Sequence, residues 1–184
     1  MTPPRAFLSR LVSLLREADV PFMVTGSLAS AAYGEPRATR DVDIVIDPAP
    51  AGLDALISLL HPEFYVSADA ARDALRERGM FNVIHLETGW KADLIVRKDR
   101  PFSREEFARR RPAHLFGSDV FVVSPEDSLL SKLEWAQKGG SEQQLRDAAG
   151  IAARTPLDSA YLHRQAVALG ITDLLERVLS GSRP

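Results

Sequence analysis

The stretch GSLASAAYGEPRATRDVDIVI, residues 26–46, decides the fold of this chain. An apolar run precedes it at residues 22–24 and is typical of a strand. Small residues at 28–33 favour a short helix, which a Gly-Glu-Pro turn ends. An Asp-Val-Asp triplet then opens a second apolar strand that ends at Ile46. The stretch therefore predicts two strands joined through a short helix and a turn.

The triplet places two acids, Asp41 and Asp43, two residues apart. Because such residues point to the same face of a strand, we expect their carboxylates to lie side by side. Two neighbouring carboxylates repel each other unless a cation lies between them. Mg²⁺ is bound in this way, through a few carboxylates and the phosphate oxygens of a substrate. A lone Asp-x-Asp is more often a solvated strand end, so the triplet needs a second signal.

The Gly26-Ser27 pair at the head of the stretch is that second signal. Glycine lets the backbone approach a phosphate closely, and Ser27 opens a helix whose first N–H groups attract anions. Gly-Ser pairs alone are common in turns. Together with the two acids at this spacing, the pair predicts a site for a nucleoside triphosphate with magnesium.

At this point the sequence resembles the nucleotidyltransferase superfamily, which has the polymerase-beta-like fold. Within the superfamily it is similar to the AbiEii-like toxin nucleotidyltransferases of abortive-infection and toxin–antitoxin systems, and to their shorter relatives. The residues that carry the resemblance are Gly26, Ser27, Leu28, Arg37, Thr39, Asp41, Asp43 and Ile44. The chain is shorter than the full-size toxins of that group, and its shorter relatives include antitoxins and enzymes that modify small molecules.

The resemblance implies a Mg²⁺-dependent enzyme that moves an NMP from an NTP, such as ATP, to an acceptor and releases pyrophosphate. Two Mg²⁺ ions would be held by Asp41, Asp43 and a third acid, which together carry the catalysis. Other residues would contact the phosphates or position the loop before Asp41; they are Gly26, Ser27, Arg37 and Thr39.

Asp93 is the predicted third acid. It is the only acid in the strand-like run at residues 91–96, which forms a hairpin with residues 82–86. A buried carboxylate is costly unless it meets a cation or hydrogen-bond donors, and a metal shared with neighbouring acids removes that cost. The resemblance likewise implies a third acid on a neighbouring strand. The alternative is an aspartate at a strand end that faces water.

Two later motifs of the AbiEii-like group match the C-terminal part of the chain. Lys132 lies on a helix next to the apolar residues Leu129, Leu130 and Leu133, and it would donate to triphosphate oxygens as a compact charge. Arg146-Asp147 matches a last motif in which an aspartate follows an arginine, so both are predicted to bind the nucleotide. The alternative is an ordinary helix surface with these side chains in water.

Composition is that of an ordinary globular protein, and the resemblance implies an α/β (α+β) fold. The chain has 184 residues, 45% of them apolar, a net charge of −2 and no cysteine. No apolar run approaches the roughly 20 residues that span a bilayer, so we expect a cytoplasmic protein without a membrane partner. We predict a mixed sheet flanked by helices at residues 1–123 and a helical region at 124–184 packed on it as one compact unit.

One feature of the sequence bears on the identity of the acceptor. It is a basic run at residues 97–111 that also contains Phe102 and Phe107. Arginines interleaved with aromatic rings favour an RNA 3′ end, such as tRNA, as the acceptor. The alternative is a solvated face with both phenylalanines in the core, which leaves a protein or small-molecule acceptor. A cognate toxin or antitoxin is a possible partner. The competing hypothesis is a non-catalytic nucleotide-binding or protein-interaction module on the same fold.

Overall fold

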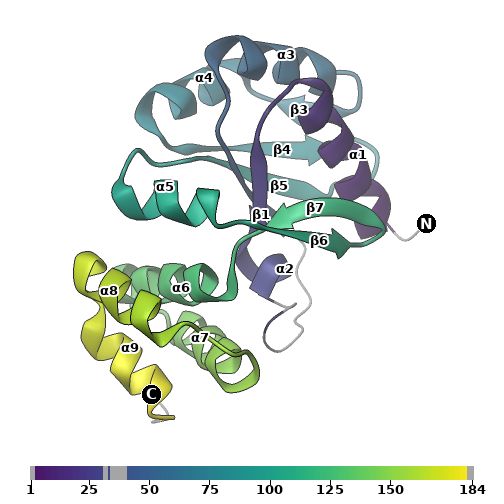
Figure 1. The fold of residues 1–184 in the computed structure, drawn as a ribbon. Coiled ribbons are helices and arrows are strands. Elements are labelled where there is room, and N and C mark those ends of the chain that lie inside the picture. The colour runs from purple at the N-terminus through teal and green to yellow at the C-terminus, as the bar shows by residue number, and fades with distance from the viewer. Residues whose placement is uncertain (1–2, 31–32, 34–40, 182–184) are drawn as a thin grey trace. The chain divides into compact units, whose positions relative to one another are not determined.

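The computed structural model describes residues 3–30, 33 and 41–181 (Figure 1). The chain divides into two compact units, each described here by itself. The sheet unit comprises Met1–Gly26 and Thr39–Val122, and the helical unit comprises Ser27–Ala38 and Val123–Pro184. Residues 27–38 group with the helical unit in this division. The predicted boundary between residues 123 and 124, and the packing of the two parts as one unit, stay predictions.

A seven-stranded mixed sheet forms the sheet unit, with strand order β3-β4-β5-β2-β1-β7-β6. The pairs β2–β5 and β1–β7 are parallel, and the other neighbours are antiparallel. The strands are β1 (Phe22–Thr25), β2 (Asp41–Ile46), β3 (Phe64–Val66), β4 (Met80–His85), β5 (Lys91–Val96), β6 (Arg111–Leu115) and β7 (Ser118–Val122). The predicted α/β class with a mixed sheet is confirmed.

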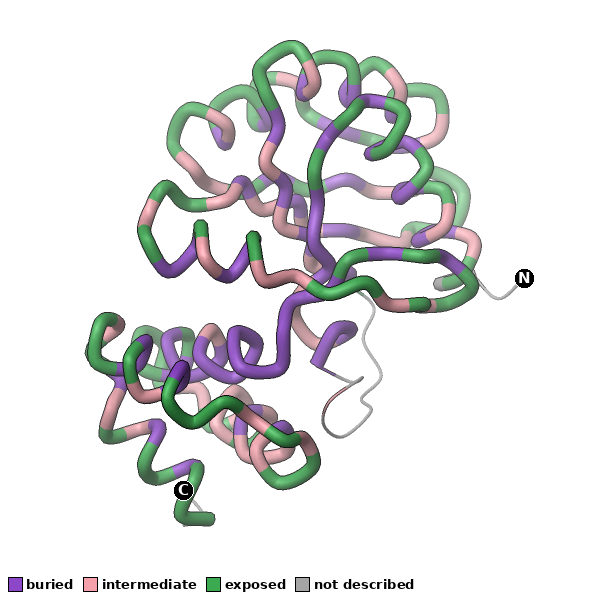
Figure 2. The backbone as a smooth tube through the Cα atoms, viewed as in Figure 1, coloured by how far each residue is buried: buried purple, intermediate pink, exposed green. Residues whose placement is uncertain are grey.

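Alternation along the central strands gives the sheet two different faces. Val42, Ile44 and Ile46 of β2 are buried, and so are their register partners Ala92, Leu94 and Val96 of β5. Since successive side chains on a strand alternate, the residues between them belong to the opposite face. That opposite face carries the acids of the two strands and is less buried (Figure 2).

Four helices belong to the sheet unit: α1 (Pro3–Glu17), α3 (Pro50–Leu60), α4 (Ala68–Glu77) and α5 (Pro101–Ala108). Leucines recur at helical spacing on α1 and α3, and Leu8, Leu11, Leu53 and Leu56 are fully buried. Helix α1 packs beside α3, and α3 beside α4. These contacts bury the apolar stripe of each helix.

Two elements differ from the sequence-based expectation. The short helix α2 spans Gly26–Ser30, so it begins two residues before the predicted segment 28–33, of which residues 31 and 32 lie outside the described residues. Strand β6, which begins at the last residue of the basic run, is absent from the sequence-based expectation. Its Pro112 cannot donate to a sheet ladder, which argues against a strand, but β6 is the edge strand, where proline is tolerated.

The helical unit is built from α2 and the helices α6 (Pro125–Gly139), α7 (Glu142–Arg154), α8 (Ser159–Leu169) and α9 (Thr172–Leu179). Ser124 caps α6 by accepting a hydrogen bond from the N–H of Asp127, and Gly140 ends it in the left-handed conformation. Among residues 3–30, 33 and 41–181, no helix has the length and apolar character needed to cross a bilayer.

Candidate functional site

A row of polar side chains crosses four neighbouring strands of the sheet. Asn82 of β4 is the register partner of Asp93 of β5, and Asp93 is the partner of Asp43 of β2. Asp43 in turn faces Thr25 at the end of β1. Because register partners in a sheet point to the same face, these four residues form one line, which we call the polar row. The predicted meeting of Asp43 and Asp93 thus follows from direct strand pairing.

Two charged residues, Lys91 and Asp41, lie next to the polar row. Asp41 is the register partner of Lys91, and each lies two residues before the acid of its own strand. The Nζ atom of Lys91 is 3.2 Å from Oδ1 of Asp93 and 3.8 Å from Oδ2 of Asp41. The hydrogen bond to Asp93 raises the pKa of Lys91 above its ordinary value, and neighbouring negative charges add to the effect. Lys91 is therefore an ammonium that bridges two strands.

Asp93 is the most constrained of the three acids. Its side chain is only 16% exposed, and Nδ2 of Asn82 donates a hydrogen bond to its Oδ1 atom. Lys91 approaches the same oxygen. Within the part of the chain that the structure describes, no residue donates to Oδ2 of Asp93, so that oxygen is available to a ligand. Asn82 acts here as a positioning residue for the carboxylate.

Gly26 provides room for the carboxylate of Asp43. The glycine has φ +65°, in the left-handed region, and a Cβ atom built on it would lie 1.9 Å from Oδ2 of Asp43. Any other residue would be strained and would also collide with that carboxylate. The sequence predicts that Gly26 allows a close approach of phosphate. In the structure, the group that it admits is the chain's own Asp43.

The residue types suit a hard divalent cation, since carboxylate oxygens are the ligands that Mg²⁺ prefers. An ammonium already lies within reach of two of the acids, so the position favours positive charge. Among the described residues, no group of three His, Cys, Asp or Glu side chains is arranged to hold a metal ion. The metal assignment of Asp41, Asp43 and Asp93 stays a prediction.

The helical unit brings together two other predicted residues, Lys132 and Asp147. Nζ of Lys132 is 2.9 Å from Oδ2 of Asp147 and donates to Oε1 of Gln144 at 3.3 Å. Gln143 donates to the other oxygen of Asp147. The lysine side chain is 7% exposed, so α6 and α7 are joined by a nearly buried ion pair. The alternative of two side chains in open water does not hold for this pair.

The remaining predicted residues are distributed as follows. Arg146 is exposed on α7, where it contacts Glu142 and Gln143. Ser27 belongs to the helical unit, and its backbone carbonyl accepts a hydrogen bond from Ser30. Arg37 and Thr39 lie outside the described residues. Nucleotide binding by these residues stays a prediction.

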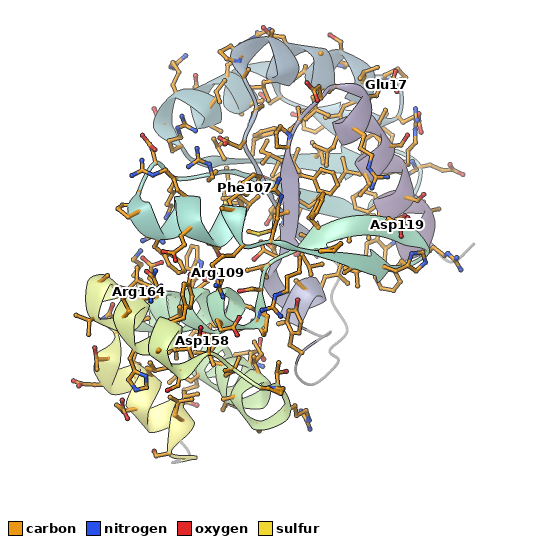
Figure 3. The ribbon with its side chains drawn as sticks, viewed as in Figure 1. Glu17, Phe107, Arg109, Asp119, Asp158 and Arg164 are labelled. Atoms are coloured by element: carbon orange, nitrogen blue, oxygen red, sulfur yellow. The ribbon has the colours of Figure 1, made fainter. Side chains whose placement is uncertain are left out.

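The structure corrects one part of the acceptor argument. Phe102 and Phe107 are only 4% and 7% exposed. Figure 3 labels Phe107. Their rings are contacted by the chain's own arginines, with Arg100 5.4 Å from the centre of Phe102 and Arg110 4.3 Å from the centre of Phe107. The expectation that they stack on bases is wrong, because both rings are buried within the sheet unit.

Arginines of the basic run also bind the protein itself. Nε of Arg97 donates to Asp47 at 2.9 Å, and Arg104 forms an ion pair with Asp99 at 2.7 Å. The run is therefore less free to bind a polyanion than its composition indicates.

Sequence reasoning missed two members of the site, Asn82 and Lys91. A signal for Lys91 exists, because it lies two residues before Asp93 and so belongs to the same strand face. The pairing of Asn82 with Asp93 depends on the hairpin register, which composition alone does not fix.

Comparison with known proteins supports the fold. No protein-family model and no curated protein matches the sequence. An antigenic nucleotidyltransferase-like protein from Paracoccidioides brasiliensis has a similar structure, with a TM-score of 0.66, 20% identity, and coverage of 97% of this chain and 88% of that one. The antibiotic-resistance factor ANT(2'')-Ia, solved with adenylyl-2''-tobramycin, gives 0.61 at 12% identity and covers 92% and 98%.

The lincomycin-bound lincosamide antibiotic adenylyltransferase LnuA is a third similar structure. It gives a TM-score of 0.51 at 13% identity, with coverage of 82% of this chain and 98% of that one. These likenesses establish that the chain has the nucleotidyltransferase fold, as its Gly-Ser and Asp-x-Asp motifs predict.

Proposed function

We propose that this protein is a Mg²⁺-dependent nucleotidyltransferase, which moves an NMP from an NTP to an acceptor and releases pyrophosphate. The observation that carries the proposal is the polar row, in which Asp43 and Asp93 are paired on adjacent parallel strands of a nucleotidyltransferase fold. Acids that would repel each other are kept together by strand pairing, and this is expected where a cation-dependent reaction takes place.

Each residue of the row has a proposed role. Asp41, Asp43 and Asp93 would hold the metal, which when bound neutralises charge on the triphosphate and favours the deprotonated acceptor oxygen. The hydrogen bond from Asn82 keeps Asp93 in one orientation. Gly26 keeps the space that Asp43 occupies. In the reaction, the acceptor oxygen forms a bond to the α-phosphorus while the bond from that phosphorus to the pyrophosphate oxygen breaks.

The acceptor is proposed to be a hydroxyl group, on an RNA 3′ end or on a small molecule. The basic run supports RNA by its charge, but its two phenylalanines are buried and two of its arginines pair with Asp47 and Asp99. Small acceptors are supported by the similar structures, which hold a tobramycin adduct and lincomycin. A role in a toxin–antitoxin system, with a cognate partner protein, stays part of the proposal.

A second candidate is a non-catalytic nucleotide-binding module. The ammonium of Lys91 favours it, because a protein-borne cation partly neutralises Asp41 and Asp93 without any metal. Such a module would bind nucleotide but transfer nothing.

The test is a transfer assay with each α-labelled NTP, Mg²⁺, and either total RNA or a panel of small hydroxyl compounds. We expect label in one of the two acceptor pools and a loss on the order of 10²–10³-fold in Asp43→Asn. Asp69→Asn, at an exposed position on α4, is the matched control and should behave as wild type. Nucleotide binding without transfer to any acceptor would favour the second candidate.

A further inference from the structure

We propose that Lys91 is a built-in counter-cation of the site, which a divalent metal must displace from Asp93 before it binds. This inference rests on the proposed function, since it concerns the same carboxylates. Lys91 belongs to none of the motifs that carry the resemblance, and its role follows from its place on the strand. It lies beside Asp41 in register and two residues before Asp93.

Geometry makes the ammonium and a metal competitors. Nζ of Lys91 is 3.2 Å from Oδ1 of Asp93, whereas Mg²⁺ binds a carboxylate oxygen at about 2.0–2.1 Å. An ammonium and a divalent ion on one carboxylate repel each other, so one of them leaves. The lysine can move, because its side chain is 34% exposed and has four rotatable carbons.

The ammonium of Lys91 also reduces the repulsion among the three carboxylates when no metal is bound. Three acids on one sheet face would repel one another in the metal-free protein. The ammonium of Lys91 offsets one of these negative charges, at 3.2 Å from Asp93 and 3.8 Å from Asp41. The lysine therefore stabilises the empty site and lowers its affinity for free metal. When the metal binds together with a triphosphate, the displaced ammonium stays close to the negative charge of the triphosphate.

The alternative is an ordinary ion pair at the sheet surface, without influence on metal binding. Lys98 offers a matched control, because it is an exposed lysine on the same unit. Lys91→Met and Lys98→Met remove the same charge from the sheet unit. Only the first removes an ammonium from the carboxylates.

The experiment measures Mn²⁺ binding to the purified full-length protein at low salt, by the electron paramagnetic resonance signal of free Mn²⁺. We expect Lys91→Met to bind Mn²⁺ about three- to fivefold more tightly than wild type, the upper part of the range that one partly exposed ion pair can supply. Lys98→Met and Lys91→Arg should match wild type within about twofold. Adding Asp43→Asn to Lys91→Met should abolish the gain, which locates the bound ion.

Two outcomes would overturn the inference in different ways. Equal Mn²⁺ affinity in Lys91→Met and Lys98→Met would remove the role of Lys91 and leave the metal site intact. No Mn²⁺ binding by wild type or Lys91→Met would remove the metal site, and with it the proposed function. If Lys91→Met does not fold, Lys91→Gln makes the same comparison with a polar side chain.

Discussion

Two lysines, one in each unit, contact aspartates in different ways. Lys91 of the sheet unit is one-third exposed and lies between Asp93 and Asp41, at 3.2 and 3.8 Å. Lys132 of the helical unit is 7% exposed and pairs with Asp147 at 2.9 Å. The first ammonium bridges two strands at the rim of a sheet face, and the second joins two helices almost out of water.

The difference indicates which cation can be exchanged. A partly exposed ion pair contributes at most about 1 kcal/mol to stability, so its charge can be displaced by a ligand at little cost. A buried pair is costly to break, since each partner would be left without a counter-charge. We therefore interpret Lys91 as an exchangeable counter-cation and the Lys132–Asp147 pair as a fixed support of the helical unit. If Lys132 contacts a phosphate, as predicted, it has to do so while it stays paired with Asp147.

The largest expected effect is on stability at Lys132. Lys132→Met should lower the free energy of unfolding by about 2–3 kcal/mol, because Asp147 loses its counter-charge while keeping its hydrogen bond from Gln143. Lys91→Met should cost less than about 1 kcal/mol. Urea denaturation without metal measures both values, and Lys138→Met, which removes an exposed lysine paired with Glu134, is the control in the helical unit.

Similar losses at Lys91 and Lys132 would contradict the comparison. Nucleotide titration sharpens it, because a lysine that contacts the outer phosphates should weaken NTP binding more than NMP binding when it is replaced. Equal weakening of NTP and NMP by Lys132→Met would leave Lys132 with a structural role only.

An effect of similar size is expected at Gly26, where the sheet unit makes room for Asp43. Gly26→Ala and Gly89→Ala both place a side chain at a positive φ, of +65° and +69°. Gly89 has no atom within 4 Å of the added Cβ, whereas Gly26 meets Asp43 at 1.9 Å. Both variants should lose about 1 kcal/mol from backbone strain, and Gly26→Ala about 1–2 kcal/mol more from the collision.

Thermal or urea unfolding of the two glycine variants side by side checks this prediction. The additional double variant Gly26→Ala/Asp43→Ala should recover the excess loss, since it removes the colliding carboxylate. Equal losses in Gly26→Ala and Gly89→Ala would show that Gly26 does not support Asp43.

The central strands could be predicted because their two signals are local. The alternation of Val42, Ile44 and Ile46 with Asp41 and Asp43 fixes both the strand and its faces. The same alternation identifies Asp93, because an acid between apolar residues has few explanations.

Other features depend on pairings that lie far apart in sequence. The contact between Gly26 and Asp43 arises only when β1 pairs with β2, and the hydrogen bond from Asn82 needs the hairpin register. The predicted stacking of bases on the basic run was wrong for a related reason. Its phenylalanines are buried, and several of its arginines contact rings or acids of the same chain. Composition does not distinguish a charge that is paired from one that is free.

The most direct test of the account is a crystal structure of the wild-type protein grown with Mn²⁺ and a non-hydrolysable NTP. The account predicts an anomalous manganese peak in contact with the carboxylates of Asp43 and Asp93, with the Lys91 ammonium displaced from Asp93. Anomalous scattering identifies the ion independently of the fitted atoms. A bound nucleotide with no manganese at these acids, and Lys91 still bridging Asp93 and Asp41, would contradict it.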